Sequence, residues 1–369
     1  MNKILLSAAI LTIAACGAAP ARAQQTPPPY KISFYGHIKT DFAYDTKGVA
    51  GDDYTQYVAT ERSLDRDFRA SARGTRLGLD LSDGDKVSGK VEADFLGLSE
   101  NAETTSAGGP TTDLRLRHAY VSFRAGKFQV LAGQTWHLLP LELSGTNNEF
   151  ALGYSGALWY RAPQLRLTYA ASERLSFAAA AVRPTRKLTD AEGTASGLPQ
   201  AQAQAQLKLG KARLTLMGAY GQWRNTATMQ RGEVQLADFG YSVPLTPALT
   251  LNGQVWTGQN LYDFLGGIGN MGYGSAEAKA SGGFANLQIK PAGRFSYNIA
   301  YGVDNPVNSR LTAGSRTRNA TLLANAACQV YERVGVTLEA ARQVTEYKLA
   351  AGYEDRENLH YQLSFKFPF

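Results

Sequence analysis

The feature that most constrains the fold of this chain is the strict alternation of apolar and polar side chains at its C-terminal end. One face of this segment carries apolar side chains and the other carries polar ones: Leu359, Tyr361, Leu363, Phe365, Phe367 and Phe369 against His360, Gln362, Ser364 and Lys366. A period of two indicates a β-strand whose faces meet different surroundings. A strand of a soluble sandwich can alternate too, but it rarely ends a chain on an exposed aromatic. A strand with lipid outside and water inside must alternate, and aromatic side chains gather at the membrane rim.

The same alternation recurs through most of the chain. Leu77 and Leu79 alternate with Arg76 and Asp80, for example, and residues 201–209 alternate alanine and leucine with glutamine and lysine. About sixteen segments follow this pattern, or roughly 22 residues for each strand and its connection. The spacing therefore predicts many similar strands in one sheet.

The connections between these segments alternate in length. Short turns occur at 83–85 and 125–127, whereas polar or glycine-rich stretches occupy 45–67, 100–113 and 258–280. Short turns on one side and long loops on the other are typical of outer-membrane barrels, with the short turns periplasmic. A soluble β-helix or a pair of sandwiches could share the strand count but not this asymmetry. We predict an all-β protein, a transmembrane antiparallel β-barrel of about 16 strands, formed by residues 24–369 as a single domain.

The first residues are typical of an export signal. Lys3 precedes an apolar run over 4–15 that is too short to anchor in a membrane, and Ala21-Arg22-Ala23 fits a signal-peptidase site. We therefore predict that residues 1–23 are cleaved. The alternative is a lipoprotein whose lipid is attached to Cys16. In the first case Cys328 remains alone, and no internal disulfide can form.

Little in the sequence points to catalysis, metal binding or nucleic acid. The histidines show no metal-ligand spacing, and no Gly-x-Ser-x-Gly motif occurs; they are His37, His118, His137 and His360. The formal net charge of +7 comes from residues spread at strand spacing rather than in a basic cluster. We predict no enzyme, no cofactor, no metal site and no nucleic-acid partner, with a lipid hydrolase that uses a Ser/His pair as the alternative.

A group of charged side chains falls on the water-facing positions of the predicted strands. If Leu77, Leu114 and Leu116 face lipid, then Arg76, Arg115 and Arg117 face the lumen. An arginine that faced lipid near the midplane would cost about 2–4 kcal/mol. The same rule predicts further lumen-facing charges at Lys39, Asp80, Lys90, Glu92 and Asp94.

Two alternatives remain open for the arginines. With Val121 and Phe123 outward, the strand over 114–123 would take the opposite register, and Arg115 and Arg117 would face lipid. Any of the arginines could also be an interfacial anchor whose side chain extends to the headgroups.

Three short motifs resemble those of the general porins of Gram-negative bacteria. Residues 74–79 (GTRLGL) resemble the second-strand motif, residues 116–121 (LRHAYV) the fourth-strand motif, and residues 159–161 (WYR) the strand after the inward-folded third loop. The resemblance implies that Arg76, Arg117 and Arg161 lie on the pore wall at its narrowest point. Residues 92–95, 114–120 and 133–136 are most similar to DcaP-type porins, which are sixteen-stranded trimeric channels for dicarboxylates. The leader 24–29 is too short for the N-terminal helical segment that some members carry.

By the same resemblance, residues 137–155 form a loop that folds into the barrel and narrows it. The carboxylates of Glu142 and Glu149 would then oppose the arginines and create a transverse field that orients dipolar solutes. The alternative is that the loop merely packs on the wall through its leucines, Leu138, Leu139, Leu141 and Leu143.

We therefore predict an outer-membrane porin of a Gram-negative bacterium that passes small hydrophilic solutes by passive diffusion and prefers anions such as carboxylates. Its partners would be outer-membrane lipid, small anionic solutes and, by resemblance, two further copies of the chain and the barrel-assembly machinery, which recognises the terminal Phe369. The alternatives are a non-selective or cation-preferring porin, because Asp41, Asp80, Glu92 and Asp94 also face the lumen, or a non-conducting structural or adhesive barrel.

Overall fold

The structure is a computed structural model, and it describes residues 30–51, 55–60, 66–97, 113–140, 142, 145–148, 150, 152–184, 190 and 193–369. The expected signal peptide over 1–23, with Cys16, lies outside these residues, as do Leu141, Leu143 and Glu149.

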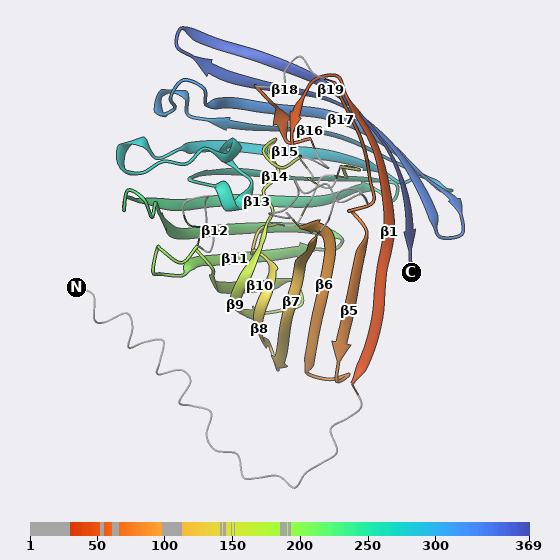
Figure 1. Cartoon of the computed structure of the whole chain (residues 1–369). Coiled ribbons are helices and arrows are strands. Elements are labelled where there is room, and N and C mark those ends of the chain that lie inside the picture. The colour runs from red at the N-terminus through yellow and green to blue at the C-terminus, as the bar shows by residue number, and fades with distance from the viewer. Residues whose placement is uncertain are drawn as a thin grey trace, which may run out of the picture.

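The described residues form one closed antiparallel barrel of 16 strands, as the sequence predicted. The sheet closes where β1 pairs with β19, and Figure 1 shows these two strands, red and dark blue, side by side. β4 and β5 act as one interrupted strand, because each pairs with a different half of β1. The barrel strands are β1 (Lys31–Asp45), β4 (Asp67–Ser71), β5 (Arg76–Ser82), β6 (Val87–Gly97), β7 (Asp113–Ala125), β8 (Phe128–Trp136), β9 (Arg161–Ala170), β10 (Leu175–Val182), β11 (Gln200–Leu209), β12 (Ala212–Arg224), β13 (Arg231–Thr246), β14 (Leu249–Gln259), β15 (Lys279–Ile289), β16 (Phe295–Pro306), β17 (Arg316–Tyr331), β18 (Val334–Leu349) and β19 (Gly352–Pro368).

The remaining elements are short. A two-stranded hairpin is formed by β2 (Val49–Ala50) and β3 (Tyr57–Val58), and the 3₁₀ helices are η1 (Tyr262–Phe264), η2 (Gly267–Gly269), η3 (Gly274–Ala276) and η4 (Asn308–Arg310). Within the described ranges, no helix is long and apolar enough to cross a membrane.

Burial follows the period of two along the strands, with the apolar face outward. On β1, Ile32 is 65% exposed whereas Lys39 is only 4% exposed. The chain end closes this outer belt: the Phe369 ring stacks on Phe34 with centroids 5.6 Å apart, and the Phe369 N–H donates to the Gly36 carbonyl at 3.1 Å. The polar side chains thus line the inside, as expected for a barrel that faces lipid outside and water inside.

Strand β7 contains a bulge that changes which face its residues occupy. Glu92 pairs with His118 and Ala93 pairs with Leu116, so Arg117 is the extra residue. Leu116 is therefore outward on one side of the bulge and Val121 on the other, while Arg117 and His118 are both buried inside. The two registers that the sequence left open each hold for one half of the strand, because a bulge shifts the alternation by one residue.

Three connections fold into the barrel and pack on its wall. They are the described residues of 137–160 between β8 and β9, residues 260–278 between β14 and β15, and the β2–β3 hairpin. The hairpin is anchored by Val58, which donates its N–H to Thr345 Oγ1 at 3.0 Å and accepts a hydrogen bond from the Tyr347 hydroxyl. The lumen therefore contains two apolar clusters as well as polar wall residues.

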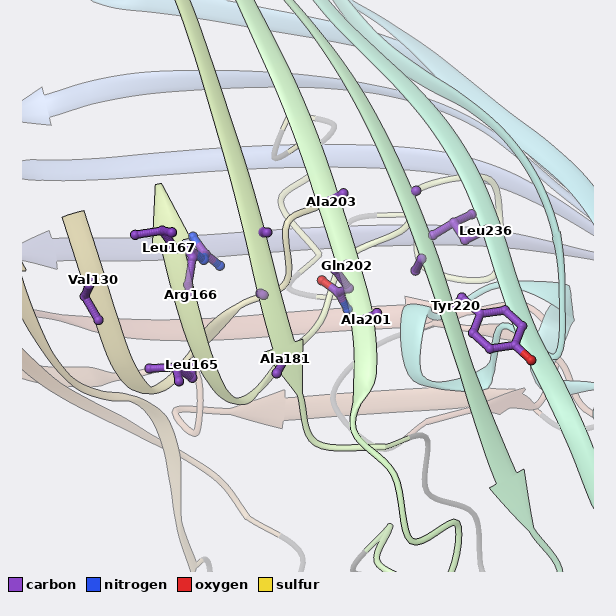
Figure 2. Close-up of a pocket in the computed structure, with 14 residues that line it drawn as sticks. Val130, Leu165, Arg166, Leu167, Ala181, Ala201, Gln202, Ala203, Tyr220 and Leu236 are labelled. Carbon is purple, nitrogen blue, oxygen red and sulfur yellow. The ribbon is translucent and has the colours of Figure 1, made fainter. Parts of the chain in front are cut away.

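The outer surface also has a wide hollow of about 1020 Å³ over β8 to β13. Figure 2 shows Leu165 and Tyr220 on either side of small residues such as Ala181, Ala201 and Ala203. Ala201 and Ala203 are on the outward face, since Gln202 between them is buried. Short side chains on the lipid-facing belt account for this hollow.

Candidate pore constriction

The predicted arginines of β5 and β7 gather on one stretch of the inner wall, around two carboxylates of β6. Arg117 Nε lies 2.5 Å from Glu92 Oε1, and its Nη1 lies 2.9 Å from Asp94 Oδ2. Arg76 Nε lies 3.9 Å from the same Glu92 oxygen. The three strands are consecutive neighbours in the sheet, so inward residues at matching heights meet directly.

Arg115 makes the most regular contact of this group. Its Nε donates to Asp94 Oδ1 at 2.9 Å and its Nη2 to Asp94 Oδ2 at 2.7 Å, which is the bidentate geometry of a guanidinium and a carboxylate. Arg115 and Arg117 both contact Asp94 Oδ2, at 2.7 and 2.9 Å. Asp94 is therefore held between two arginines, and it fixes both.

Arg161 begins β9, and aromatic rings hold it rather than a carboxylate. Its guanidinium carbon lies 4.3 Å from the centroid of the Trp136 ring and 5.9 Å from that of Trp159. In the described part of the chain Arg161 makes no ion pair, and its Nη1 is buried without a hydrogen-bond partner. This geometry is a cation–π contact, which fixes the charge without neutralising it.

The other predicted lumen charges are present on the inner face in compensated pairs. Lys39 Nζ lies 3.0 Å from Asp41 Oδ1, and Lys90 Nζ lies 2.8 Å from Asp80 Oδ1. The Tyr35 hydroxyl donates to Glu92 at 2.8 Å and accepts from Lys90 at 2.9 Å, which joins the Lys90–Asp80 pair to the arginine wall. On this stretch of wall, Arg76, Arg115, Arg117 and Arg161 lie around Glu92 and Asp94: four positive charges against two negative give +2.

The described residues of the connection between β8 and β9, which include most of the loop predicted over 137–155, lie inside the barrel and are held by hydrogen bonds to its wall. Leu138 donates its N–H to Gln202 of β11 at 3.0 Å, and Leu158 donates its N–H to Gln254 of β14 at 2.7 Å. Near the middle of the loop, the main-chain oxygen of Asn147 accepts a hydrogen bond from Lys39 Nζ of β1 at 3.1 Å. Inward amides and a lysine thus satisfy the loop backbone, as buried polar groups require.

Leucine packing and polar contacts act together in this loop. Leu138 and Leu139 are both 2% exposed and belong to an apolar cluster with Phe264 of the 260–278 connection. His137 lies 5.0 Å from the Phe264 ring, and burial lowers the pKa of its imidazole to about 3. His137 is therefore a neutral packing residue at the base of the loop.

Glu142 differs from the expectation. Its carboxylate is buried and forms an ion pair with Arg213 of β12 instead of opposing the arginines unpaired. Arg213 was not predicted as a site residue, although it shares the inward parity of Thr215 and Met217, and this pattern could have identified it. Glu149, the other predicted acid of the loop, is outside the described residues.

The histidines of the described residues have partners on the barrel wall rather than in a metal-ligand cluster. In those ranges no group of three or more His, Cys, Asp or Glu side chains could hold a metal ion. The His360 Nδ1 contacts Asp45 at 3.0 Å, and the His118 Nδ1 contacts Thr135 at 3.0 Å, so both rings have wall partners.

Comparison with known proteins places this geometry in context. The family model described as Gram-negative porin matches residues 7–259. The outer-membrane channel DcaP of Acinetobacter baumannii has a similar structure, with a TM-score of 0.78 at 17% identity, covering 94% of this chain and 99% of that one.

Two further solved structures show the same fold at lower identity. The anion-selective porin from Comamonas acidovorans has a TM-score of 0.61 at 12% identity, covering 92% of this chain and 100% of that one. The trimer form of OmpT from Vibrio cholerae has a TM-score of 0.59 at 12% identity, covering 92% and 99%. No sequence among the curated proteins matches the chain.

Proposed function

The chain belongs to the Gram-negative porin family and forms a channel of the outer membrane, and we propose that this channel passes small hydrophilic solutes by passive diffusion with a preference for anions such as carboxylates. The preference for anions follows from the charges on the inner wall of the barrel. It rests on the wall formed by β5, β6 and β7.

One observation carries the anion preference: two cations of this wall, Arg76 and Arg115, are partly exposed on its inner face, and the two carboxylates are buried. The side chains of Arg115 and Arg76 are 33% and 21% exposed, whereas those of Glu92 and Asp94 are 9% and 0% exposed. A solute that passes the wall therefore meets guanidinium groups, with the carboxylates behind them. Guanidinium groups bind carboxylates through paired hydrogen bonds, which favours that class of anion.

The covered carboxylates also hold the arginines in place. A free arginine side chain has several rotatable bonds, so its charge would move over several ångströms. The bidentate contact of Arg115 with Asp94, and the contact of Arg117 with both carboxylates, remove most of that freedom. A fixed group loses less entropy when a solute binds, so this arrangement strengthens a weak and rapid interaction.

Two further parts of the proposal concern assembly. We propose a homotrimer, which the trimer form of a structurally similar porin supports. We also propose that Phe369 is recognised by the barrel-assembly machinery before it closes the sheet. The position of its ring against Phe34, at the seam of β1 and β19, supports a role in closure.

Single-channel recording of the purified protein in a KCl gradient tests this proposal. Three equal conductance steps and a reversal potential that favours chloride would support a trimeric anion-preferring channel. A reversal potential that favours potassium would refute the anion preference and leave a cation-preferring porin. Folded protein that passes no current would instead favour a structural barrel with a blocked lumen.

A further inference from the structure

A second basic site lies at the end of the barrel that carries the short turns. A hollow of about 350 Å³ is lined by residues from β16 to β19 and the turns between them. We call it the exit hollow, and its polar lining consists of Arg294, Ser296, Gln329, Arg333 and Lys366. This volume is in the range of pockets that hold small molecules.

Ser296 and Lys366 of the lining belong to the inner side of the barrel. Ser296 alternates with the exposed Phe295 and Tyr297, and Lys366 continues the inward series of Gln362 and Ser364 on β19. Short turns of outer-membrane barrels are periplasmic. The exit hollow is therefore part of the periplasmic mouth of the channel.

The cations of the exit hollow come from three separate segments of the chain. Arg294 precedes β16, Arg333 lies in the turn between β17 and β18, and Lys366 is near the end of β19. No aspartate or glutamate is among the described residues that line the hollow. Within the described ranges, neither Arg294 nor Arg333 makes an ion pair, unlike the arginines of the constriction.

The nearest carboxylate in sequence does not compensate this charge. Glu332 precedes Arg333 but is not part of the lining, and its contact with the hollow is through its main-chain oxygen, which accepts a hydrogen bond from the Gln329 amide. Converging like charges repel one another, and a bound anion relieves that repulsion. The Ser296 hydroxyl and the Gln329 amide add neutral hydrogen-bond groups beside the cations.

The surrounding rim strengthens the attraction. The other short turns and their flanks carry more basic than acidic side chains: Lys86, Arg124, Lys127, Arg174, Lys208, Lys211 and Lys290 against Asp83, Asp85 and Glu173. A mouth lined by one sign of charge raises the local concentration of the opposite ion. The rim therefore attracts anions without specificity, whereas the exit hollow brings several hydrogen-bond donors close to one another.

We propose that the exit hollow binds the oxyanion group, carboxylate or phosphate, of a small solute at the periplasmic mouth of the channel. The inference extends the proposed function, because it assigns the anionic solute a second binding station after the constriction. Arg294 and Arg333 contribute forked donors that match either oxyanion, and Lys366 contributes a point charge.

Isothermal titration calorimetry of the purified, folded protein in detergent at low ionic strength tests this site, with inorganic phosphate and succinate as separate probes. The test variant is Arg294→Gln with Arg333→Gln. The control is Arg174→Gln with Lys211→Gln, which removes the same charge from short turns outside the hollow. All four side chains are exposed, so both variants should fold, and the heat-dependent gel shift of folded barrels checks this.

The expected result is a loss of affinity of about tenfold or more in the test variant, with the control within about twofold of the native protein. Binding of both probes, each displacing the other, would show a shared oxyanion site, and binding of one alone would identify the source of the oxyanion. An equal loss of affinity in the test and control variants would overturn the inference, because the attraction would then come from the rim charge alone. Absence of binding by the native protein would overturn it as well.

The reversal potential in a KCl gradient, measured on the same preparations, separates this inference from the proposed function. If the native channel prefers chloride but its affinity for phosphate and succinate does not depend on Arg294 and Arg333, only the proposed binding site in the exit hollow is refuted. If the native channel prefers potassium but its affinity for the two probes depends on these arginines, the anion preference is refuted. The binding site in the exit hollow is then still supported.

Discussion

Removal of the two partly exposed arginines of the wall is the sharpest test of charge selectivity. The variant Arg76→Gln with Arg115→Gln removes two cations that face lumen water and leaves Arg117 between Glu92 and Asp94. The formal charge of the group that also includes Arg161 of β9 then falls from +2 to zero. Glutamine retains hydrogen-bonding groups and much of the side-chain length, so the packing of the wall should change little.

The size of the effect follows from the charge and the distance. A monovalent ion about 6 Å from one wall charge has an interaction energy of roughly 0.7 kcal/mol in water. A Debye length of about 10 Å at 0.1 M salt reduces this to about 0.4 kcal/mol. Chloride gains this energy and potassium loses it, so each charge alters their ratio by about 0.8 kcal/mol, or about fourfold. Two charges should lower the chloride-to-potassium ratio by about 15-fold.

The assay is the reversal potential of single channels in a KCl gradient, repeated at about 0.1 M and at about 1 M salt. The matched control is Arg318→Gln with Arg342→Gln, which removes two arginines from outward positions where they pair with Asp355 and Glu357. We expect the wall variant to lose most of its chloride preference at low salt, and the effect to shrink at high salt because screening is stronger. A reversal potential equal to that of the control at low salt would refute the assignment of selectivity to this wall.

Three further predictions concern stability and assembly. Arg117→Ala should lower stability by about 3–5 kcal/mol, because it leaves Glu92 and Asp94 buried without their shared partner; thermal unfolding measures the loss, and adding Glu92→Gln should restore part of it. His137 has a folded pKa of about 3 against 6.5 when unfolded, so the stability it contributes is complete above pH 6.5 and declines as the pH falls toward 3. Between pH 7 and pH 5 the native protein should lose roughly 2 kcal/mol more than His137→Gln, and equal losses would show that His137 does not titrate as argued. Phe369→Ala should slow barrel formation, since the aromatic contact with the first strand is worth about 0.5–1.5 kcal/mol; the folded fraction on a gel over time measures this, and an unchanged rate would exclude a role of the ring in closure.

The sequence predicted the barrel well because alternation is a local property that each strand carries by itself. Leu77 and Leu79 are outward and Arg76 is inward, as their spacing indicated. The bulge at Arg117 could not be found in this way, because it depends on the pairing of β7 with β6 and not on β7 alone. The sequence therefore offered two registers for one strand, and the structure uses both.

The pairing of the inner charges was also beyond the sequence. Glu92 and Asp94 were expected to face the lumen, but parity does not show that the arginines of two neighbouring strands cover them. The inward folding of residues 260–278 and of the β2–β3 hairpin was missed for a similar reason. Their buried residues, such as Phe264 and Val58, lie in stretches with no regular period, and contacts with distant strands hold them in place.

These pairings change how the strength of the anion preference should be understood. Counting arginines against loop carboxylates suggests a field set by four cations, but two of those charges are cancelled by Glu92 and Asp94. The carboxylates fix the guanidinium groups and at the same time limit the depth of the attractive well. A deep well would retain a carboxylate solute and slow its passage, whereas a shallow one favours entry and still permits release. We infer that the covered carboxylates of β6 keep the constriction weak enough for rapid diffusion, so Asp94→Asn should raise anion preference and lengthen the residence of a dicarboxylate in the channel.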